Sequence, residues 1–310
     1  MPDVALSANA LIAASRRPNV QRVLVLAAIV GLGLGLETLF LHLTTDPLAD
    51  VQAYYDAGAR LNAGEPLYVQ AVGTDDAAFY RYPPLLAIAF RPLALLPFGV
   101  AAAIWEAILV GLFALTIVRL GPGLRTTWLV VGMLALPTAW ALVIGQAQIA
   151  VTFLMALGSP WALALATNLK VLPALVAVFW IGRRDWRSVG WFVVWLAILG
   201  LVQLAVEPSG TTSFPAQFGL AQVGNVNNYS LFGISPWLWA AAVVIGLGVA
   251  LRMAATPVGW GIAVALSVLA TPRLLLYQLA TLVAAVRGPA PAGGDRADPA
   301  TDSSRGPAGS

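Results

Sequence analysis

Long apolar runs, separated by short polar turns, follow one another along most of the chain. The first run covers residues 23–41, and at roughly 20 residues it is long enough to cross the ~30 Å hydrocarbon layer of a bilayer as a helix. The pattern predicts an all-α fold, a polytopic bundle of transmembrane helices.

Further apolar runs are candidates for spans. They include residues 83–97, 100–118, 127–144, 147–157, 190–206, 231–251, 259–270 and 274–286. Pro97, Pro137 and the Gly145-Gln146 pair favour interrupted helices, which lipid tolerates only where protein or a water-filled cavity covers the freed backbone. We expect about ten spans, with about eight as the alternative if two runs between residues 83 and 158 are short re-entrant pieces.

Arginines indicate which ends of the spans face the cytoplasm. Three precede the first span, and the densest cluster lies at 183–187. Because cytoplasmic loops are enriched in Lys and Arg, residues 1–22 and this loop should be cytoplasmic. Because one span separates residues 1–22 from the first loop, at about 42–82, this loop should lie outside. The tail at 288–310 is rich in Pro, Gly, Ala, Asp and Ser, which predicts a disordered cytoplasmic segment. We therefore expect a multi-pass plasma-membrane protein whose membrane domain covers residues 23–287.

Composition excludes several classes of function. The chain is 59% hydrophobic and only 10% charged, whereas a soluble domain carries about a quarter charged residues. The absence of cysteine excludes disulfides, thiolate metal sites and a Cys nucleophile, and the single histidine, His42, excludes a multi-His metal centre. The net charge of +3 is spread thinly and is no nucleic-acid footprint. Nothing in the sequence demands a cofactor or a metal ion.

The first external loop concentrates acid, because six of the 14 acidic residues lie in it. From Asp50 onward the loop has helical spacing, with Val51, Tyr54, Tyr55 and Ala59 able to share one face. Tyrosines are typical of the headgroup boundary. The loop is therefore predicted to carry an interfacial helix that lies on the membrane.

Four ionisable residues lie within apolar runs, where each is a candidate for function unless it is paired. Glu37 is close enough to the outer end of its run to reach water. Arg91 and Glu106 flank the Pro97 turn and are expected to satisfy one another. Lys170 is the only lysine and has no acid nearby in sequence. Its partner is therefore either a lipid phosphate or a distant carboxylate.

Two local motifs have structural alternatives. Arg81 lies among the aromatic residues 79–82, where it could hold a phosphate or anchor a helix end. The glycines from Gly31 to Gly35 lie inside a span with no strand before them. They are therefore expected to serve close helix packing and not to form a nucleotide-binding loop.

The order of short motifs resembles glycosyltransferase family 87. These are integral-membrane enzymes of the GT-C fold, and they include polyprenyl-phosphate-mannose-dependent α-1,2-mannosyltransferases of actinobacteria. The motifs are Asp50…Tyr54-Tyr55…Gly64-Glu-Pro-Leu-Tyr68, Tyr82-Pro-Pro-Leu85, Pro92-Leu-Ala-Leu-Leu-Pro97, Gly145-Gln146, Lys170-Val-Leu-Pro173, Asn228-Tyr-Ser-Leu231 and Thr271-Pro-Arg-Leu-Leu-Leu-Tyr277. The resemblance runs from about residue 23 to residue 286.

The resemblance implies transfer of a hexose, in the first place mannose, from a polyprenyl-phosphate donor to an acceptor hydroxyl at the extracytoplasmic face, with inversion. The acceptor would be a glycolipid or polysaccharide. Asp50 would be the general base, because a carboxylate within reach can take the proton of a weakly nucleophilic hydroxyl. The residues implied at the donor phosphate are Lys170, Arg81 and Arg273, and those implied at the sugar or acceptor are Gln146, Asn228, Tyr82 and Tyr277.

Two other classes of function stay open at this level. Broken helices and buried charges also characterise transporters, so a flippase for lipid-linked sugar is one alternative. The other is a degenerate, non-catalytic member of the family. Its basis is that the chain has Asn-Tyr-Ser-Leu at 228–231, where the family commonly has Asn-Gln-Ser-Leu, and Tyr277-Gln278 where the family often has histidine or aspartate.

Overall fold

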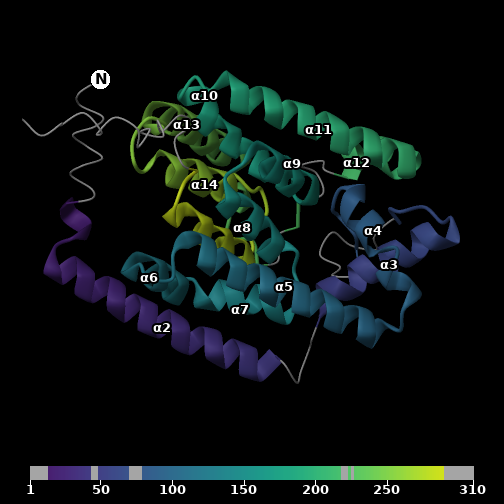
Figure 1. Ribbon diagram of the computed structural model, residues 1–310, viewed down its shortest axis with the longest axis horizontal. Helices are drawn as coiled ribbons and strands as arrows, with labels where there is room; N and C mark the ends of the chain where they lie inside the picture. Colours follow the sequence, from purple (N-terminus) through teal and green to yellow (C-terminus); the bar gives the residue numbers. More distant parts are fainter. Residues whose placement is uncertain (1–12, 43–47, 70–78, 218–222, 225–226, 290–310) are drawn as a thin grey trace, which may run out of the picture.

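The computed structural model describes residues 13–42, 48–69, 79–217, 223–224 and 227–289, and every regular element in these ranges is a helix (Figure 1). In chain order they are α2 (Pro18–His42), α3 (Ala49–Ala63), α4 (Pro84–Phe90), η1 (Leu93–Leu95), α5 (Phe98–Leu120), α6 (Arg125–Met133), α7 (Ala135–Val143), α8 (Gln148–Leu157), α9 (Pro160–Leu169), η2 (Leu172–Ala177), α10 (Val178–Gly182), α11 (Trp186–Val206), α12 (Pro208–Gln217), η4 (Leu231–Gly233), α13 (Pro236–Met253), α14 (Gly259–Leu269) and η5 (Leu276–Val286). The all-α fold class is confirmed. The tail beyond residue 289 lies outside the described residues.

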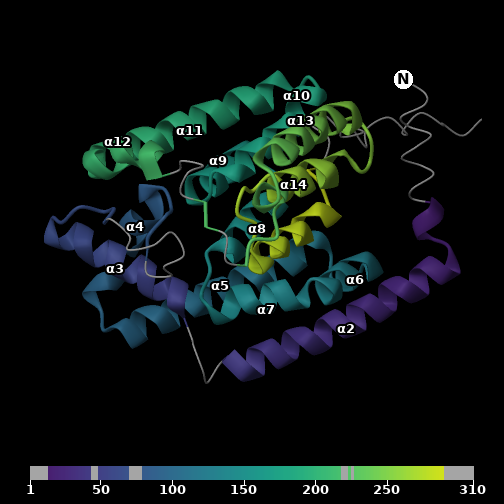
Figure 2. The same ribbon diagram turned by 180° about the vertical axis from the view of Figure 1, so that it is seen from behind.

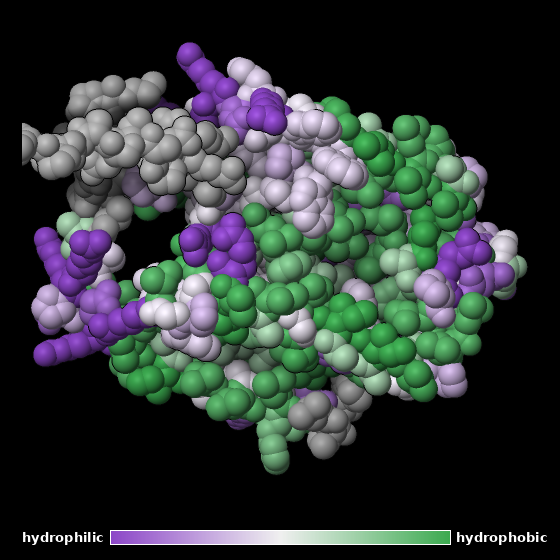
Figure 3. Space-filling view, viewed as in Figure 1, coloured by the Kyte–Doolittle hydropathy of each residue, from purple (hydrophilic) through white to green (hydrophobic). Residues whose placement is uncertain are grey.

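Four of the described helices, α2, α5, α11 and α13, are long and apolar enough to cross a membrane. They keep large apolar side chains exposed, such as Phe40 on α2, Leu201 on α11 and Val244 on α13. Figure 3 shows hydrophobic side chains over much of one face of the molecule. Helices whose apolar side chains face outward are typical of lipid contact. The chain is therefore an integral membrane protein.

The helix α7 continues α6 after a sharp bend. Together they pass the same test of length and hydropathy, but they are bent by 61° at their junction. Pro137 lies in the first turn of α7, where its ring and missing N–H disfavour a continuous helix. An interrupted helix was predicted at this proline, and the bend confirms it.

The remaining apolar runs form short helices, so the expected count of ten spans is not confirmed. The run at 83–97 is divided between α4, of seven residues, and the single turn η1. The helices α8, α14 and η5 contain 10, 11 and 11 residues, about half of what a crossing needs. Eight of the ten residues of α8 are buried. The short helices thus form the protein interior, where other helices cover their free backbone groups.

Glycines allow α2 to lie directly on α6 and α7, as predicted. A Cβ on Gly31 would overlap the backbone oxygen of Gly132, and a Cβ on Gly35 would lie 2.8 Å from the carbonyl carbon of Ala135. Both neighbours are backbone atoms that cannot move aside independently. Small residues at these positions are therefore required for the close approach of the helices.

The predicted helix of the first loop is present as α3, but its apolar face packs inside the protein. Val51 and Tyr54 are completely buried, and α3 lies against α4, η1 and α5. The expectation that Tyr54 lies at the headgroup boundary is therefore wrong. An amphipathic pattern shows that one face is buried, but it does not distinguish a protein interior from a membrane surface. That α3 lies at the membrane interface stays a prediction.

The ends of the long helices separate two sides of the molecule. In Figure 1, the N-terminal end of α2 and the junction of α10 and α11 lie on the left, and α3, α4 and α12 lie on the right; Figure 2 shows the same separation from behind. The guanidinium of Arg287 is also close to Gly121, at the C-terminal end of α5. The arginine-rich ends are thus opposite to α3, as the predicted topology requires.

Candidate active site

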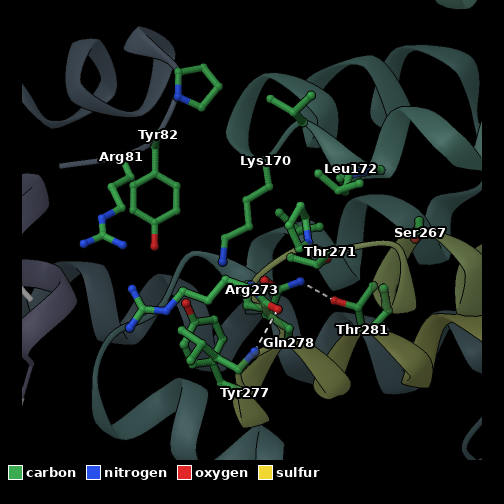
Figure 4. Close-up of a pocket in the computed structure, with 18 of the residues that line it drawn as sticks. Arg81, Tyr82, Lys170, Leu172, Ser267, Thr271, Arg273, Tyr277, Gln278 and Thr281 are labelled. Carbon is green, nitrogen blue, oxygen red and sulfur yellow. Dashed lines mark hydrogen bonds between the residues drawn. The ribbon is translucent and has the colours of Figure 1, made fainter. Parts of the chain in front are cut away.

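A cavity of about 230 Å³ lies between the segment before α4, the break between α9 and η2, and the segment that leads into η5 (Figure 4). Its polar lining combines three cationic side chains with two tyrosines. These are Arg81, Lys170, Arg273, Tyr82 and Tyr277. Val151, Met155, Leu172, Pro173, Val268 and Leu275 contribute apolar walls. Five of the residues that the family resemblance implies therefore meet in one cavity.

Lys170 lies at a turn of the chain and not within a helix. Its backbone leaves the helical region at the end of α9, where φ is −147° and ψ is 128°. The segment that contains Lys170 begins after Gly158 and ends at Gly182. A Cβ added to Gly158 would contact Pro289, and a Cβ added to Gly182 would contact Ala254. Between these two ends, Lys170 contacts the aromatic residues of the cavity. The helices on either side thus form a hairpin, with the ammonium group at its tip.

Two aromatic rings hold the Lys170 side chain. Its Nζ lies 5.3 Å from the ring centroid of Tyr82 and 4.8 Å from that of Tyr277. Both distances are within the range of a cation–π interaction. Figure 4 shows the side chain reaching into the space between these residues and Arg273. The ammonium group is therefore directed into the cavity.

Asp50 supplies the carboxylate that sequence alone could not identify for Lys170. It lies in the first turn of α3, and its backbone N–H donates a hydrogen bond to Ile144 O at 3.1 Å. The polar side chains of Tyr82 and Gln146 and the charge of Lys170 favour the ionised form of its carboxylate. Asp50 is partly buried and adjoins the cavity without lining it.

The environment of Asp50 tunes its acidity towards neutrality. Burial raises the pKa of Asp50 to about 6, while Lys170, the polar side chains of Tyr82 and Gln146, and Arg81 act in the opposite direction. A carboxylate with this pKa is ionised at neutral pH and is a stronger base than an exposed aspartate. General bases work best when their pKa lies near the operating pH. Asp50 therefore has the properties of a general base.

Gln146 is the centre of a buried hydrogen-bond network behind Asp50. Its Oε1 accepts a hydrogen bond from Tyr54 Oη at 2.7 Å, and its Nε2 lies 3.0 Å from Tyr82 Oη. The Tyr54 hydroxyl in turn accepts from the Ala147 N–H at 3.3 Å. Gln146 is completely buried and does not line the cavity. Its position fits the orientation of Asp50 and Tyr82 better than direct contact with a sugar.

The turn that carries Gln146 depends on glycine. Gly145 has a φ of +66°, and a Cβ there would overlap Val51 Cγ2. The Gly145 carbonyl accepts a hydrogen bond from Trp105 Nε1 at 2.8 Å. Only glycine combines this backbone conformation with the absence of a side chain. The predicted break between α7 and α8 thus places Gln146 under α3.

Asn228 holds the backbone of the segment that carries Arg273. Its Nδ2 donates to Pro272 O at 3.1 Å, and its Oδ1 accepts from Ser230 N and Leu274 N at 2.9 and 3.1 Å. The residue does not line the cavity. The structure thus gives Asn228 backbone partners on both sides of Arg273.

The expected pair of Arg91 and Glu106 does not form. Arg91 Nε donates to Asn62 Oδ1 at 3.0 Å, and Asn62 Nδ2 donates back to Arg91 O at 2.8 Å. Glu106 lies instead near Gly145, where a Cβ would be 2.8 Å from its Oε1. The sequence predicted this pair because both residues flank the Pro97 turn. The exposed amide of Asn62 on α3 satisfies Arg91 without removing it from the surface.

Sequence reasoning missed three polar residues near the cavity. Tyr54 was assigned to the membrane boundary, although it supports Gln146. Gln148 and Thr281 line the cavity and are both almost completely buried. The available signal was a glutamine and a threonine four residues apart, at 148 and 152, on one face of an otherwise apolar helix.

Comparison with known proteins identifies a family and two relatives of the chain. The family model described as glycosyltransferase family 87 matches residues 79–289, about two thirds of the chain, and so does not include Asp50. The chain is 29% identical over 232 residues to the polyprenol-phosphate-mannose-dependent alpha-(1-2)-phosphatidylinositol pentamannoside mannosyltransferase of Mycolicibacterium smegmatis, covering 64% of this chain and 56% of that protein. It is 26% identical over 251 residues to a protein of the same name from Mycobacterium tuberculosis, covering 73% of this chain and 57% of that protein. The chain thus spans little more than half the length of these relatives. No solved structure matches the chain.

Proposed function

The chain belongs to glycosyltransferase family 87, and on this basis we propose that it is a membrane glycosyltransferase that uses a polyprenyl-phosphate sugar. The sugar is a hexose, and mannose is the first candidate, because the similar mycobacterial proteins are named as dependent on polyprenol-phosphate-mannose. The same names support a glycolipid acceptor.

The observation that carries the proposal is the meeting of one carboxylate with three cations at a single cavity. Asp50 comes from α3, Lys170 from the tip of the α9–η2 hairpin, and Arg81 and Arg273 from two further segments. Residues so distant in sequence are brought together only by the fold. Their chemistry matches the two requirements of sugar transfer from a lipid phosphate, which are a base for the acceptor and positive charge for the leaving group.

In the proposed step, the acceptor oxygen attacks the anomeric carbon while its proton passes to the Asp50 carboxylate. The new bond joins the acceptor oxygen to the anomeric carbon, and the bond between that carbon and the phosphate oxygen breaks. The electron pair of the broken bond leaves with polyprenyl phosphate. A base of this kind contributes about 10²–10⁴-fold in rate.

Lys170, Arg81 and Arg273 would stabilise the charge that develops on the phosphate. A phosphate monoester is a stable anion and needs little help from a general acid, so cations suffice. Because Asp50 adjoins the cavity without lining it, the acceptor and the donor would approach the anomeric carbon from different sides. This geometry suits a single displacement with inversion of configuration.

The reaction is assigned to the extracytoplasmic face. The arginine-rich helix ends lie on the side of the molecule opposite to α3 (Figure 1), and such ends face the cytoplasm. Asp50, at the start of α3, would then face outward. A periplasmic reporter fused after Asp76 should be active, and a cytoplasmic signal there would overturn this topology.

The proposal is tested by comparing the wild type with Asp50→Asn in purified, reconstituted protein. Polyprenyl-phosphate mannose is supplied with phosphatidylinositol mannosides, and transfer of labelled mannose is measured. We expect transfer by the wild type to fall at least about 100-fold in Asp50→Asn. The matched control is Asp56→Asn, because Asp56 lies on the same helix and bonds only the exposed Gln52 amide among the described hydrogen bonds. That variant should retain activity.

Other outcomes identify the alternatives. Equal transfer by Asp50→Asn and wild type removes Asp50 as the base. Movement of intact donor across liposomes without any transfer indicates a flippase. Failure of the wild type both to transfer and to move the donor indicates a non-catalytic member of the family.

A further inference from the structure

One wall of the cavity carries polar groups that the proposed reaction does not use. Gln148 in the first turn of α8 and Thr281 on η5 line the cavity, with exposed fractions of only 4% and 1%. Gln148 Nε2 donates a hydrogen bond to Thr281 Oγ1, which Figure 4 marks with a dashed line at Thr281. Gln148 Oε1 is buried and has no hydrogen-bond partner among the described residues.

Counting protons agrees with the orientation of the Gln148 amide in which Nε2 donates to Thr281. Thr152 Oγ1 donates to the backbone oxygen of Gln148 at 2.8 Å, so its single proton is used there. The contact of 3.3 Å between Thr152 Oγ1 and Thr281 Oγ1 therefore takes its proton from Thr281. Thr281 can then only accept from Gln148, so the Nε2 group of Gln148 faces Thr281. Its Oε1 is left as an acceptor without a donor.

An acceptor of this kind selects its ligand. A carbonyl oxygen repels a phosphate, whose oxygens are also acceptors, and binds a group that carries a proton. The cations Arg81, Lys170 and Arg273 line the same cavity and favour an anion. The cavity therefore has a phosphate-binding part and a part that suits a hydroxyl.

The size of the cavity suits a single small head group. Sites for drug-sized molecules usually occupy roughly 300–1,000 Å³, whereas this cavity has about 230 Å³. A sugar ring joined directly to a phosphate carries both required groups within this space.

We infer that Gln148 Oε1 accepts a hydrogen bond from a ring hydroxyl of the donor sugar, and that Gln148 with Thr281 forms a specificity site for that hydroxyl. The inference rests on the proposed function, because it assigns the ligand of the cavity as a sugar phosphate. Thr281 and Thr152 act as positioning residues that hold the amide in the required orientation. Specificity arises because a ligand that lacks the hydroxyl leaves the buried oxygen unpaired.

The test uses binding and transfer with a series of donor lipids. The lipids are polyprenyl-phosphate mannose, its 2-, 3-, 4- and 6-deoxy analogues, and polyprenyl phosphate without sugar. Binding is measured at equilibrium with detergent-solubilised protein, so the result does not depend on turnover. The variants are Gln148→Met, which keeps a side chain of similar length, and Thr281→Val, which keeps the shape of the threonine. Gln21→Met serves as the control, since Gln21 is a half-buried glutamine on α2 that does not line the cavity.

We expect the wild type to bind one deoxy analogue about tenfold more weakly than the parent donor, as one hydrogen bond predicts. Gln148→Met should bind the parent donor about tenfold more weakly than the wild type does, with no further loss for that analogue. Its affinity for polyprenyl phosphate should be unchanged. Thr281→Val should show the same pattern more weakly, and Gln21→Met should match the wild type.

The two levels of the proposal fail in different ways. One contrary result is that, in Gln148→Met, removal of a hydroxyl from the donor still weakens binding as much as it does in the wild type. If this holds for every deoxy analogue, the specificity site is overturned, even if the wild type transfers mannose. Equal loss of affinity for polyprenyl phosphate and for the parent donor also overturns it, because the residue then affects the cavity in general. If the wild type binds with the expected pattern but does not transfer, the proposed function fails and the specificity site stands. No binding of either lipid by a folded wild-type protein overturns both.

Discussion

Replacing Tyr82 with phenylalanine removes a hydroxyl that favours the ionised form of Asp50 and keeps the aromatic ring. The Tyr82 hydroxyl stabilises ionised Asp50, together with Gln146 and the charge of Lys170. The ring that contacts the Lys170 ammonium, at 5.3 Å, stays in place. The variant therefore changes the acidity of the proposed base with little effect on the cation beside it.

The direction and size of the effect follow from the charge of the carboxylate. Burial places the pKa of Asp50 at about 6, so kcat/KM for the wild type should fall as the pH drops through about 6. A hydrogen bond to a charged group contributes about 1.5–3 kcal/mol, and one pKa unit corresponds to about 1.4 kcal/mol. Loss of the Tyr82 hydroxyl removes stabilisation of the ionised form of Asp50. The midpoint of the acid limb should therefore rise by about one pH unit in Tyr82→Phe.

The assay measures kcat/KM for mannose transfer between pH 5 and pH 8.5 in detergent. Tyr55→Phe is the matched control, because Tyr55 lies on α3 but donates its hydroxyl to Leu96 O at 2.8 Å and not to Asp50. Its midpoint should equal that of the wild type. A wild-type profile that is flat from pH 5 to pH 8 would refute the assignment of Asp50 as base. A midpoint in Tyr82→Phe that stays at the wild-type pH or falls would refute the role of the Tyr82 hydroxyl.

Three further predictions concern stability, measured by thermal unfolding in detergent. Asp50→Asn should unfold at a higher temperature than the wild type at pH 7.5. The pKa of Asp50 is higher in the folded than in the unfolded protein, so ionised Asp50 lowers the free energy of unfolding by about 3 kcal/mol. The difference in unfolding temperature should narrow at pH 5, where Asp50 of the folded wild type keeps its proton. Gly145→Ala should lower the free energy of unfolding by about 2–5 kcal/mol, because the positive φ and the overlap of the new Cβ with Val51 Cγ2 both destabilise the folded state. Adding Val51→Ala to this variant should recover part of the loss. Gly31→Ala should destabilise the contact of α2 with α6, whereas Gly33→Ala, which meets nothing within 4 Å on the same helix, should be neutral or slightly stabilising.

Features that depend on local chemistry could be predicted from the sequence. Hydropathy located the long helices, and Pro137 indicated the bend between α6 and α7. The absence of a strand before Gly31 excluded a nucleotide loop and left close packing as its role, which the structure confirms. These inferences need only neighbours in the chain and the physics of a helix in lipid.

Features that depend on which faces meet could not be predicted in the same way. The periodicity around Tyr54 was correct, but a buried face looks the same whether protein or membrane covers it. Arg91 and Glu106 were paired because they flank one turn, yet Asn62 on α3 lies closer to Arg91. Gln148 was not recognised at all, because its hydrogen-bond partner Thr281 is 133 residues away. Contacts at such separations are decided by tertiary packing.

The structure allows a direct test of which group is the partner of Lys170. The sequence allowed either a lipid phosphate or a distant carboxylate, and the fold brings Asp50 close enough to act on Lys170 while directing the ammonium into the cavity. If neutralising Asp50 were the only role of Lys170, then Lys170→Met would not weaken the binding of polyprenyl phosphate to Asp50→Asn. We expect instead that the double variant binds polyprenyl phosphate at least about tenfold more weakly than Asp50→Asn, because a partly desolvated charge pair contributes more than about 1.4 kcal/mol. The double variant also removes any need for a carboxylate partner, so misfolding caused by an unpaired lysine cannot produce this loss. Equal binding by the two variants would assign Lys170 to Asp50 alone and leave the phosphate to Arg81 and Arg273.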